Sequence, residues 1–142
     1  MIITNKRIAA LDYGMARIGL AVCDEMHITI STRPVIENTS GMWDTLLAQL
    51  DKDRIDVVLV GVPRRLDGVV SPIVATILEF IAELRKRTVR PVVEVDESFS
   101  TSRAKEIMVT TGMKKKRRAT KGTKDALAAA VILRDFLEEH RV

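Results

Sequence analysis

Three acidic residues occupy places in the sequence where an acid can do chemistry. Asp12 closes an apolar stretch, Glu97 directly follows another, and Asp125 opens an alanine-rich one. Carboxylates that come together repel, and their pKa values rise unless a cation joins them. Mg²⁺ or Mn²⁺ removes that conflict because both prefer oxygen ligands. Two such ions about 3.5–4 Å apart can support hydrolysis of a phosphodiester. A structural reading stays open, in which Asp125 only favours a helix dipole.

The remaining residue types exclude several other kinds of site. The histidines are His27 and His140, and Cys23 is the single cysteine, so neither a zinc cluster nor an intrachain disulfide is expected. No apolar run reaches the roughly 18 residues that a membrane span needs, and Asp12 and Arg17 interrupt any signal-like apolar region. We therefore expect a cytoplasmic protein that does not enter a membrane.

Basic residues gather just before the third acid. The net charge is +4, and a run of five cations, together with Lys121 and Lys124, places seven positive charges ahead of Asp125. Such a run can be a solvated loop, but the acids alone would repel nucleic acid, which favours a clamp on a phosphate backbone. Aromatic residues make up 4% of the chain, which argues against a base-stacking platform. The candidate nucleic-acid-binding residues are Arg17, Arg64, Arg65, Lys114, Lys115, Lys116, Arg117, Arg118, Lys121 and Lys124.

The elements that must position these residues form one α/β domain over 1–142. Apolar and alternating runs predict strands at 7–12, 17–23, 27–36, 56–61 and 91–95. Helical spacing predicts helices at 43–50, from Ser71-Pro72 onward, at 100–111 and at 125–139. We expect a five-stranded mixed sheet, antiparallel in its first three strands and then parallel, with helices on both faces. Ligands collect beyond the carboxyl ends of such strands, where the three acids could meet.

Several single residues carry smaller expectations. Gly14 is expected to permit a tight turn, and Gly19 to permit close packing in the first hairpin. Gly61, in Gly61-Val62-Pro63, either ends a strand plainly or borders the acidic site. Since neighbouring residues on a strand point to opposite faces, Asp96 and Glu97 should not both enter that site. Core positions are expected for Met42, Trp43 and Cys23.

Four segments around these acids resemble the YqgF/RuvX-type family, described as Holliday junction resolvases and as pre-16S rRNA nucleases. Residues 10–24, ALDYGMARIGLAVCD, are similar to the family's D-x-G turn followed by R-I-G-(V/L)-A-V. Gly61-Val62-Pro63 with Asp67-Gly68 resembles G-x-P-x-x-x-D-G, and DESFST at 96–101 resembles D-E-R-(L/F)-(S/T)-T. Lys121-Gly122 with DALAA at 125–129 resembles the closing K-G-x-x-D-x-x-A-A. Ser98 and Ala16 depart from the pattern, where arginine and lysine are usual.

The resemblance implies an RNase H-like fold in which Asp12, Glu97 and Asp125 are catalytic acids that bind Mg²⁺ or Mn²⁺. It also implies maturation of the 5′ end of 16S rRNA, with structured RNA, branched DNA and ribosomal precursor particles as candidate partners. A Holliday junction resolvase would need a symmetric dimer, and the sequence shows no obvious dimer face, so a monomer or weak homodimer is expected. A non-catalytic RNA-binding assembly factor is a further alternative. An ATPase of the actin and sugar-kinase type also begins D-x-G but needs a second domain.

Overall fold

The computed structural model describes residues 2–64, 71–97 and 121–140. Its strands are β1 (Ile8–Tyr13), β2 (Arg17–Cys23), β3 (Ile30–Glu37), β4 (Val57–Val62) and β5 (Val92–Asp96). Its helices are α1 (Met42–Lys52), α2 (Pro72–Arg87) and α5 (Lys121–Glu139). All five predicted strands are confirmed, with ends shifted by a few residues. The predicted helix at 100–111 lies outside the described residues.

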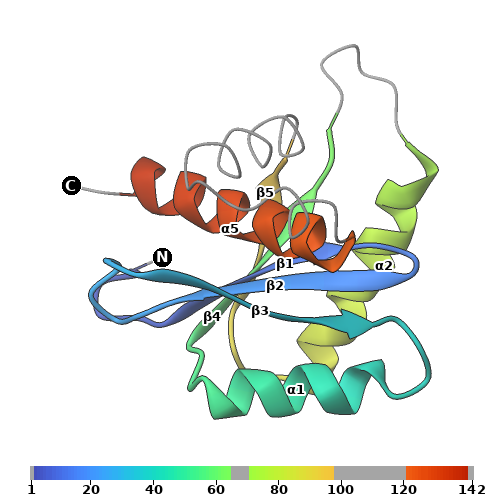
Figure 1. The fold of residues 1–142 in the computed structure, drawn as a ribbon, viewed down its shortest axis with the longest axis horizontal. Coiled ribbons are helices and arrows are strands. Elements are labelled where there is room, and N and C mark those ends of the chain that lie inside the picture. Colours follow the sequence, from blue (N-terminus) through green and yellow to red (C-terminus); the bar gives the residue numbers. More distant parts are fainter. Residues whose placement is uncertain (1, 65–70, 98–120, 141–142) are drawn as a thin grey trace.

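The strands form one mixed sheet in the order β3-β2-β1-β4-β5 (Figure 1). The first three strands pair antiparallel, and β4 pairs parallel with both β1 and β5. The predicted topology is therefore confirmed, and Pro34 lies on β3, an edge strand, where its missing N–H breaks no central ladder. Strands β1 and β5 flank β4, so their carboxyl ends emerge at the same edge of the sheet.

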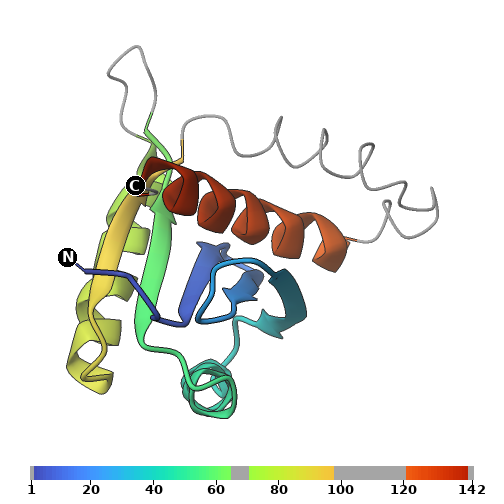
Figure 2. The ribbon, with the colours of Figure 1, turned by 90° about the vertical axis from the view of Figure 1, so that its left-hand side faces the viewer.

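Helices cover both faces of the sheet, α5 on one side and α1 with α2 on the other (Figure 2). Side chains alternate between the two layers because the period of a strand is two residues. Ala9 and Leu11 of β1 pack with α1 and α2, whereas Ile8 and Ala10 pack under α5. Each layer is apolar and buried, so the continuous apolar runs of β1 and β4 are explained by cover on both faces.

Two helix starts differ in how well local sequence predicts them. α2 begins as expected, with Ser71 at the N-cap and Pro72 in the first turn, although the Ser71 side chain makes no capping hydrogen bond. α5 begins at Lys121, so the prediction that Asp125 lies in the first turn was wrong. Asp125 instead lies one turn inside the helix, where its side chain can face the sheet.

No helix within the described ranges is long and apolar enough to cross a membrane.

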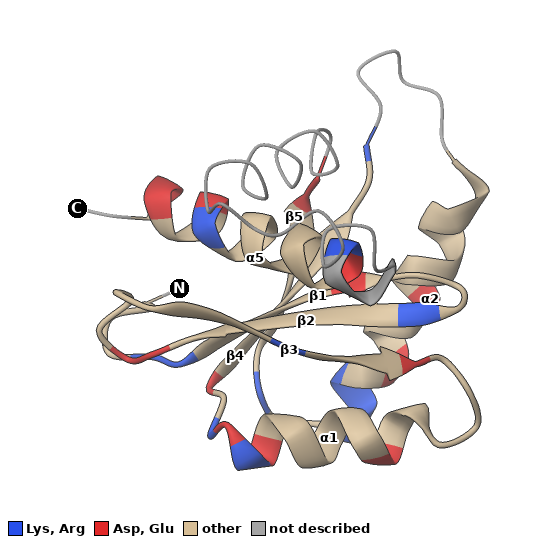
Figure 3. Ribbon diagram, in the orientation of Figure 1, with Lys and Arg blue, Asp and Glu red and all other residues tan. Residues whose placement is uncertain are grey.

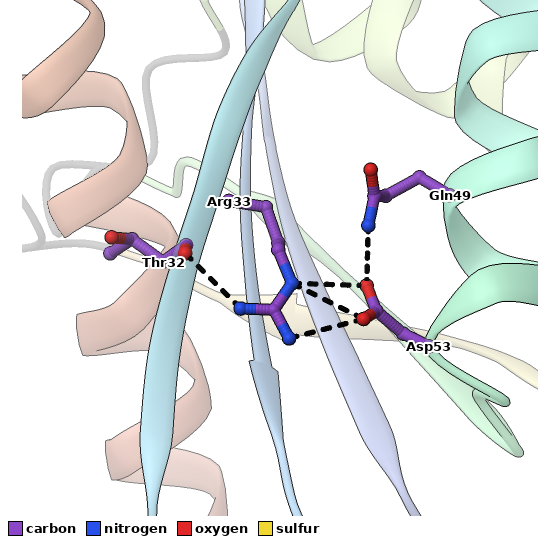
Figure 4. A network of polar contacts seen from close by, with 4 residues as sticks. All are labelled: Thr32, Arg33, Gln49 and Asp53. Atoms are coloured by element: carbon purple, nitrogen blue, oxygen red, sulfur yellow. Dashed lines mark hydrogen bonds and ion pairs between the residues drawn. The ribbon is translucent and has the colours of Figure 1, made fainter.

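A polar network ties the edge strand β3 to the end of α1 (Figure 4). Arg33 donates from Nε and Nη2 to the carboxylate of Asp53 at 3.1–3.2 Å, and Gln49 Nε2 donates to the same carboxylate at 2.8 Å. Burial of Asp53 would raise its pKa, but the hydrogen bonds from Arg33 and Gln49 outweigh that effect and lower it. The lowered pKa of Asp53 can therefore be compared with the pKa of the candidate site acid Asp12.

Candidate active site

Strand alternation brings Asp12 and Glu97 to one face and one end of the sheet. Asp12 follows Ile8 and Ala10 on the face of β1 that α5 covers. Val93 and Val95 of β5 point to the same face, and Glu97 continues their alternation one residue beyond the strand. The Glu97 N–H donates to the Val62 carbonyl at 3.1 Å, which extends the parallel ladder and fixes where the Glu97 side chain leaves the backbone.

The carboxyl group of Asp12 sits in the electrostatic conflict that the sequence predicts. Its pKa is raised to about 9, first by burial, then by the charge of Glu97 and a hydrogen bond with Glu97, and last by the charge of Asp125. At neutral pH, in the absence of a cation, Asp12 therefore keeps its proton and shares it with Glu97. Glu97 acts on Asp12 through its charge and a hydrogen bond, whereas Asp125 acts on Asp12 through its charge alone.

Asp125 has a cationic partner of its own. Arg17 Nε donates to Asp125 Oδ2 at 3.0 Å, and both side chains are about one-third exposed (29% and 31%). Arg17 begins β2 and Asp125 lies in the first half of α5, so the pair joins sheet to helix beside Asp12. Figure 3 shows the charged segment at the start of α5 toward the same end of the sheet as the basic segment of β2, whereas the other charged segments of α5 lie toward the opposite end. The group formed by Asp12, Glu97 and Asp125 thus already has one fixed positive charge beside it, that of Arg17.

Two glycines allow this convergence by leaving space for their neighbours. A Cβ at Gly19 would overlap the backbone carbonyl of Asp125, so Gly19 lets α5 approach β2. A Cβ at Gly61 would overlap the Glu97 carboxylate and lie 2.6 Å from the Cδ1 of Ile132. Gly61 therefore lies beside Glu97 within β4, and the expectation that Arg64 and Arg65 reach a phosphate stays a prediction. Gly19 serves helix packing rather than the hairpin itself.

The donor set suits a hard divalent ion, although the ligands are not yet gathered around one. Among the described residues, no three His, Cys, Asp or Glu side chains already stand in metal-binding geometry. One carboxylate oxygen of Asp125 is turned toward the Arg17 guanidinium instead. The donors of the three acids are carboxylate oxygens, which Mg²⁺ and Mn²⁺ prefer, and the raised pKa of Asp12 reflects first its desolvation and then the repulsion that a cation would relieve.

A family model described as RuvX, Holliday junction resolvase, matches residues 6–139. The chain belongs to the RuvX family. A relative from Flavobacterium johnsoniae is 34% identical over 138 residues, covering 95% of this chain and 98% of the relative. One from Chlorobium luteolum is 38% identical over 136 residues, covering 95% and 96%. Both carry the name "Putative pre-16S rRNA nuclease". The predicted resemblance is confirmed, and the family assigns the chain to the phosphodiester-cleaving nucleases.

Solved structures of resolvases share the fold of this RuvX-family chain. A fowlpox virus resolvase in complex with Holliday junction DNA matches with a TM-score of 0.60 at 17% identity, covering 94% of this chain and 97% of that one. RuvC from T. thermophilus, also bound to a junction, matches with a TM-score of 0.59 at 16% identity, covering 94% and 96%. At these identities the likeness concerns the fold, and it confirms the RNase H-like architecture.

The candidate nucleic-acid contacts of this RuvX-family chain are placed unevenly. Arg17 lies at the acidic residues, Lys124 is exposed one residue before Asp125, and Arg64 is half exposed with Nη2 3.6 Å from Glu94. Lys121 begins α5, and its side chain is not among those described. Outside the described residues lie Arg65, Lys114, Lys115, Lys116, Arg117 and Arg118. The predicted clamp therefore stays a prediction.

Sequence reasoning did not foresee the pairing of Arg17 with Asp125. Residues 17, 19, 21 and 23 of β2 share one face, and Ala21 and Cys23 pack under α5. That alternation would have placed Arg17 against α5 once α5 was known to cross β2. The crossing of α5 over β2 has no local signal in the sequence, because it depends on packing between segments that are far apart in the chain. Arg17 and Asp125 are 108 positions apart.

Proposed function

We propose that this chain is a single-domain, divalent-metal-dependent nuclease that hydrolyses phosphodiester bonds in structured RNA, at the 5′ end of precursor 16S rRNA. One observation carries the proposal: Asp12 is partly buried beside Glu97 and within the field of Asp125, and the pKa of Asp12 rises to about 9 through this desolvation and these charges. Placing these carboxyl groups together does not stabilise the fold, and strongly shifted pKa values of this kind cluster at functional sites. A bound cation would remove the repulsion between the carboxylates. The names of the relatives from Flavobacterium johnsoniae and Chlorobium luteolum support RNA as the substrate.

Asp12, Glu97 and Asp125 would hold Mg²⁺ or Mn²⁺ between them. When bound, such ions lower the pKa of water and stabilise the charge on the leaving oxygen. The chain itself supplies position and charge. Glu97 is fixed by its backbone bond to Val62, and Asp12 by its place in the β1 ladder opposite Gly19. Asp12 must give up its proton before it can act as a ligand.

The substrate must reach a site whose own side chains are mostly negative. We assign that task to the cations around Asp125, namely Arg17, the exposed Lys124 and the basic run at 114–118. A phosphate backbone that meets several cations releases counterions, so RNA binding should weaken steeply as salt rises. Ribosomal precursor particles would present such a backbone. The single thiol, Cys23, is buried and free, which suits work in the reducing cytoplasm.

The test measures cleavage of RNA with and without a divalent ion. Purified chain is incubated with precursor 16S rRNA, with Mg²⁺, Mn²⁺ or EDTA, beside the Asp12→Asn variant. We expect cleavage of the RNA with a divalent ion, none in EDTA, and none with Asp12→Asn although that variant keeps its fold by circular dichroism. Unchanged turnover by Asp12→Asn would remove the proposed mechanism. Salt-sensitive RNA binding without cleavage under either ion would favour a non-catalytic assembly factor.

Holliday junction resolution is the second candidate, and the description of the matching family favours it. The same acids would cleave branched DNA, but cutting two strands symmetrically requires two copies of the chain. A four-way DNA junction is therefore added to the assay, and the mass of the chain in solution is measured with and without it. Paired symmetric cuts by a dimer would choose this candidate over the RNA nuclease.

A further inference from the structure

Arg17 uses one of its nitrogens and leaves the others available. Its Nε donates to Asp125 Oδ2 at 3.0 Å, and within the described part of the chain neither Nη1 nor Nη2 has an acceptor. The side chain is 29% exposed, so this outer edge of the guanidinium is reached from solvent. A guanidinium carries five N–H donors in a rigid plane, and four of them belong to the two Nη atoms.

The backbone around Arg17 is held in place, so the guanidinium does not sample a wide volume. Asn38 Nδ2 donates to the Gly14 carbonyl at 2.9 Å, and the Asn38 N–H donates to the Ala16 carbonyl at 3.0 Å. A Cβ at Gly14 would lie 2.7 Å from the Arg17 carbonyl oxygen, so the turn closes tightly just before β2. The ion pair with Asp125 then fixes the far end of the side chain.

The free edge of Arg17 fits one class of ligand. Planar, bidentate N–H pairs match the oxygens of a phosphate, and a guanidinium that is already positioned loses little entropy on binding. A phosphodiester approaching Asp12 and Glu97 meets negative charge, and Arg17 is the cation that the described residues place in direct contact with this group of acids.

We propose that Arg17 binds a phosphate of the substrate backbone through Nη1 and Nη2 while its Nε keeps Asp125 in place. This inference rests on the proposed nuclease function, because it names a substrate contact of the same site. It makes Arg17 a two-sided residue: one edge positions an acid, and the other positions the strand to be cut. No bond forms or breaks at Arg17.

A double-mutant cycle separates the two roles. Arg17→Gln, Asp125→Asn and the double variant are compared with the parent for binding of a labelled RNA hairpin and of a four-way DNA junction. Binding is measured in EDTA, so that neither metal nor cleavage intervenes, across a series of salt concentrations. Circular dichroism and thermal melting confirm that each variant is folded. Arg87→Gln is the matched control, because Arg87 ends α2 on the opposite face of the sheet and pairs with Glu83 at 2.9 Å.

Loss of one phosphate contact lowers the slope of log K against log salt by about 0.7–0.9, which is a roughly five- to eightfold loss of affinity at 0.1 M salt. We expect this loss for Arg17→Gln and again when Arg17→Gln is added to Asp125→Asn. Asp125→Asn alone and Arg87→Gln should keep the parental slope. The probe whose binding weakens in Arg17→Gln, the RNA hairpin or the DNA junction, identifies the nucleic acid that supplies the phosphate.

The outcomes distinguish the inference from the proposed function. If Arg17→Gln changes nothing in the Asp125→Asn background while the parent still cleaves RNA, Arg17 only holds Asp125 and the inference is overturned alone. If the parent binds with the Arg17-dependent slope but cleaves nothing with Mg²⁺ or Mn²⁺, the phosphate contact stands and the nuclease proposal fails. A parent that binds neither probe overturns both.

Discussion

The backbone of Gly61 lies directly against the carboxylate of Glu97, with no room for a side chain between them. The same Cβ would also press on Ile132 of α5, so Gly61 is enclosed by the acid on one side and the helix on the other. Because β4 separates β1 from β5, the smallest residue on the central parallel strand sets how close Glu97 can come to Asp12. The geometry of the acids thus depends on a residue with no chemistry of its own.

Gly61→Ala should therefore damage the acidic site more than the fold. The added methyl must push Glu97 away from Asp12, and we expect at least about a tenfold loss of divalent-ion-dependent cleavage. Overpacking at Ile132 should cost about 1–3 kcal/mol of the free energy of unfolding. Gly41→Ala is the control, since a Cβ there meets nothing within 4 Å. Equal cleavage by the two variants would show that the position of Glu97 does not depend on Gly61.

Gly19→Ala tests a different contact, because its Cβ would meet backbone rather than a side chain. The Asp125 carbonyl cannot rotate away, so α5 must shift from β2 as a whole. We expect a larger loss of thermal stability than for Gly61→Ala, together with loss of the ion pair between Arg17 and Asp125. Thermal melting measures the loss of stability, and hydrogen exchange of the α5 amides reports the loosening of the helix that would break the ion pair. A melting temperature equal to that of Gly41→Ala would contradict this account.

Local sequence predicts most of the frame that positions these residues. The shared direction of β1 and β5 predicted that Asp12 and Glu97 lie at one end of the sheet, and period-two alternation predicted that Asp96 and Glu97 point to opposite faces. The parallel order of β1, β4 and β5, and the packing of Val93 and Val95 under α5, agree with both expectations. Ser71-Pro72 marked the start of α2, and Pro34 marked the edge strand. These features are visible in sequence because each depends on neighbours only a few residues away.

The parts that sequence did not predict depend on packing between distant segments. The start of α5 was placed too late because Lys121 to Lys124 carry no apolar pattern, so Asp125 was assigned to the first turn. The space at Gly61 and Gly19 arises only when α5 and β5 are in place. The partner of Arg17 could not be chosen among the acids before the path of α5 across β2 was known. Trp43, expected in the core, is only partly buried and stacks on Phe80.

Asp12→Asn should stabilise the metal-free chain at neutral and alkaline pH. The pKa of Asp12 is about 9 in the folded state against an ordinary value of 3.8, so the folded state binds this proton more tightly than the unfolded state. Stability from this group is therefore complete below about pH 4 and is lost as pH rises toward 9. Asparagine carries no charge to desolvate, so at pH 8 in EDTA we expect it to gain at least about 1 kcal/mol, or roughly 3 °C. Thermal melts from pH 4 to pH 9 measure this, and parallel curves for the two proteins would refute it.

Divalent ions should compete with the proton on Asp12. Below about pH 9 the carboxyl must ionise before it can bind a cation, so ion binding releases a proton and its apparent affinity rises with pH. For one proton the gain is about tenfold per pH unit. Titration calorimetry with Mn²⁺ between pH 6 and pH 8, in two buffers of different ionisation enthalpy, measures both quantities. Asp12→Asn should lose the proton release, and an affinity of the parent that does not change with pH would place the ion elsewhere.

Asp53 offers the opposite sign of pH dependence at a distance from the acids. Its carboxylate accepts hydrogen bonds from Arg33 and Gln49, which lower the pKa of Asp53 in spite of burial. The stabilisation of the fold by Asp53 is therefore present above about pH 4 and is lost as pH falls through this lowered pKa.

Asp53→Asn should cost about 1–2 kcal/mol of the free energy of unfolding at pH 7, because Arg33 keeps a half-buried charge without its partner. Asp44→Asn, an exposed acid on the same helix, should cost less than about 1 kcal/mol. Neither variant should alter RNA cleavage measured well below its melting temperature, since the hydrogen bonds described for Arg33 and Asp53 include none with Asp12, Glu97 or Asp125. A loss of cleavage by folded Asp53→Asn would mean that the edge of the sheet reaches the substrate as well.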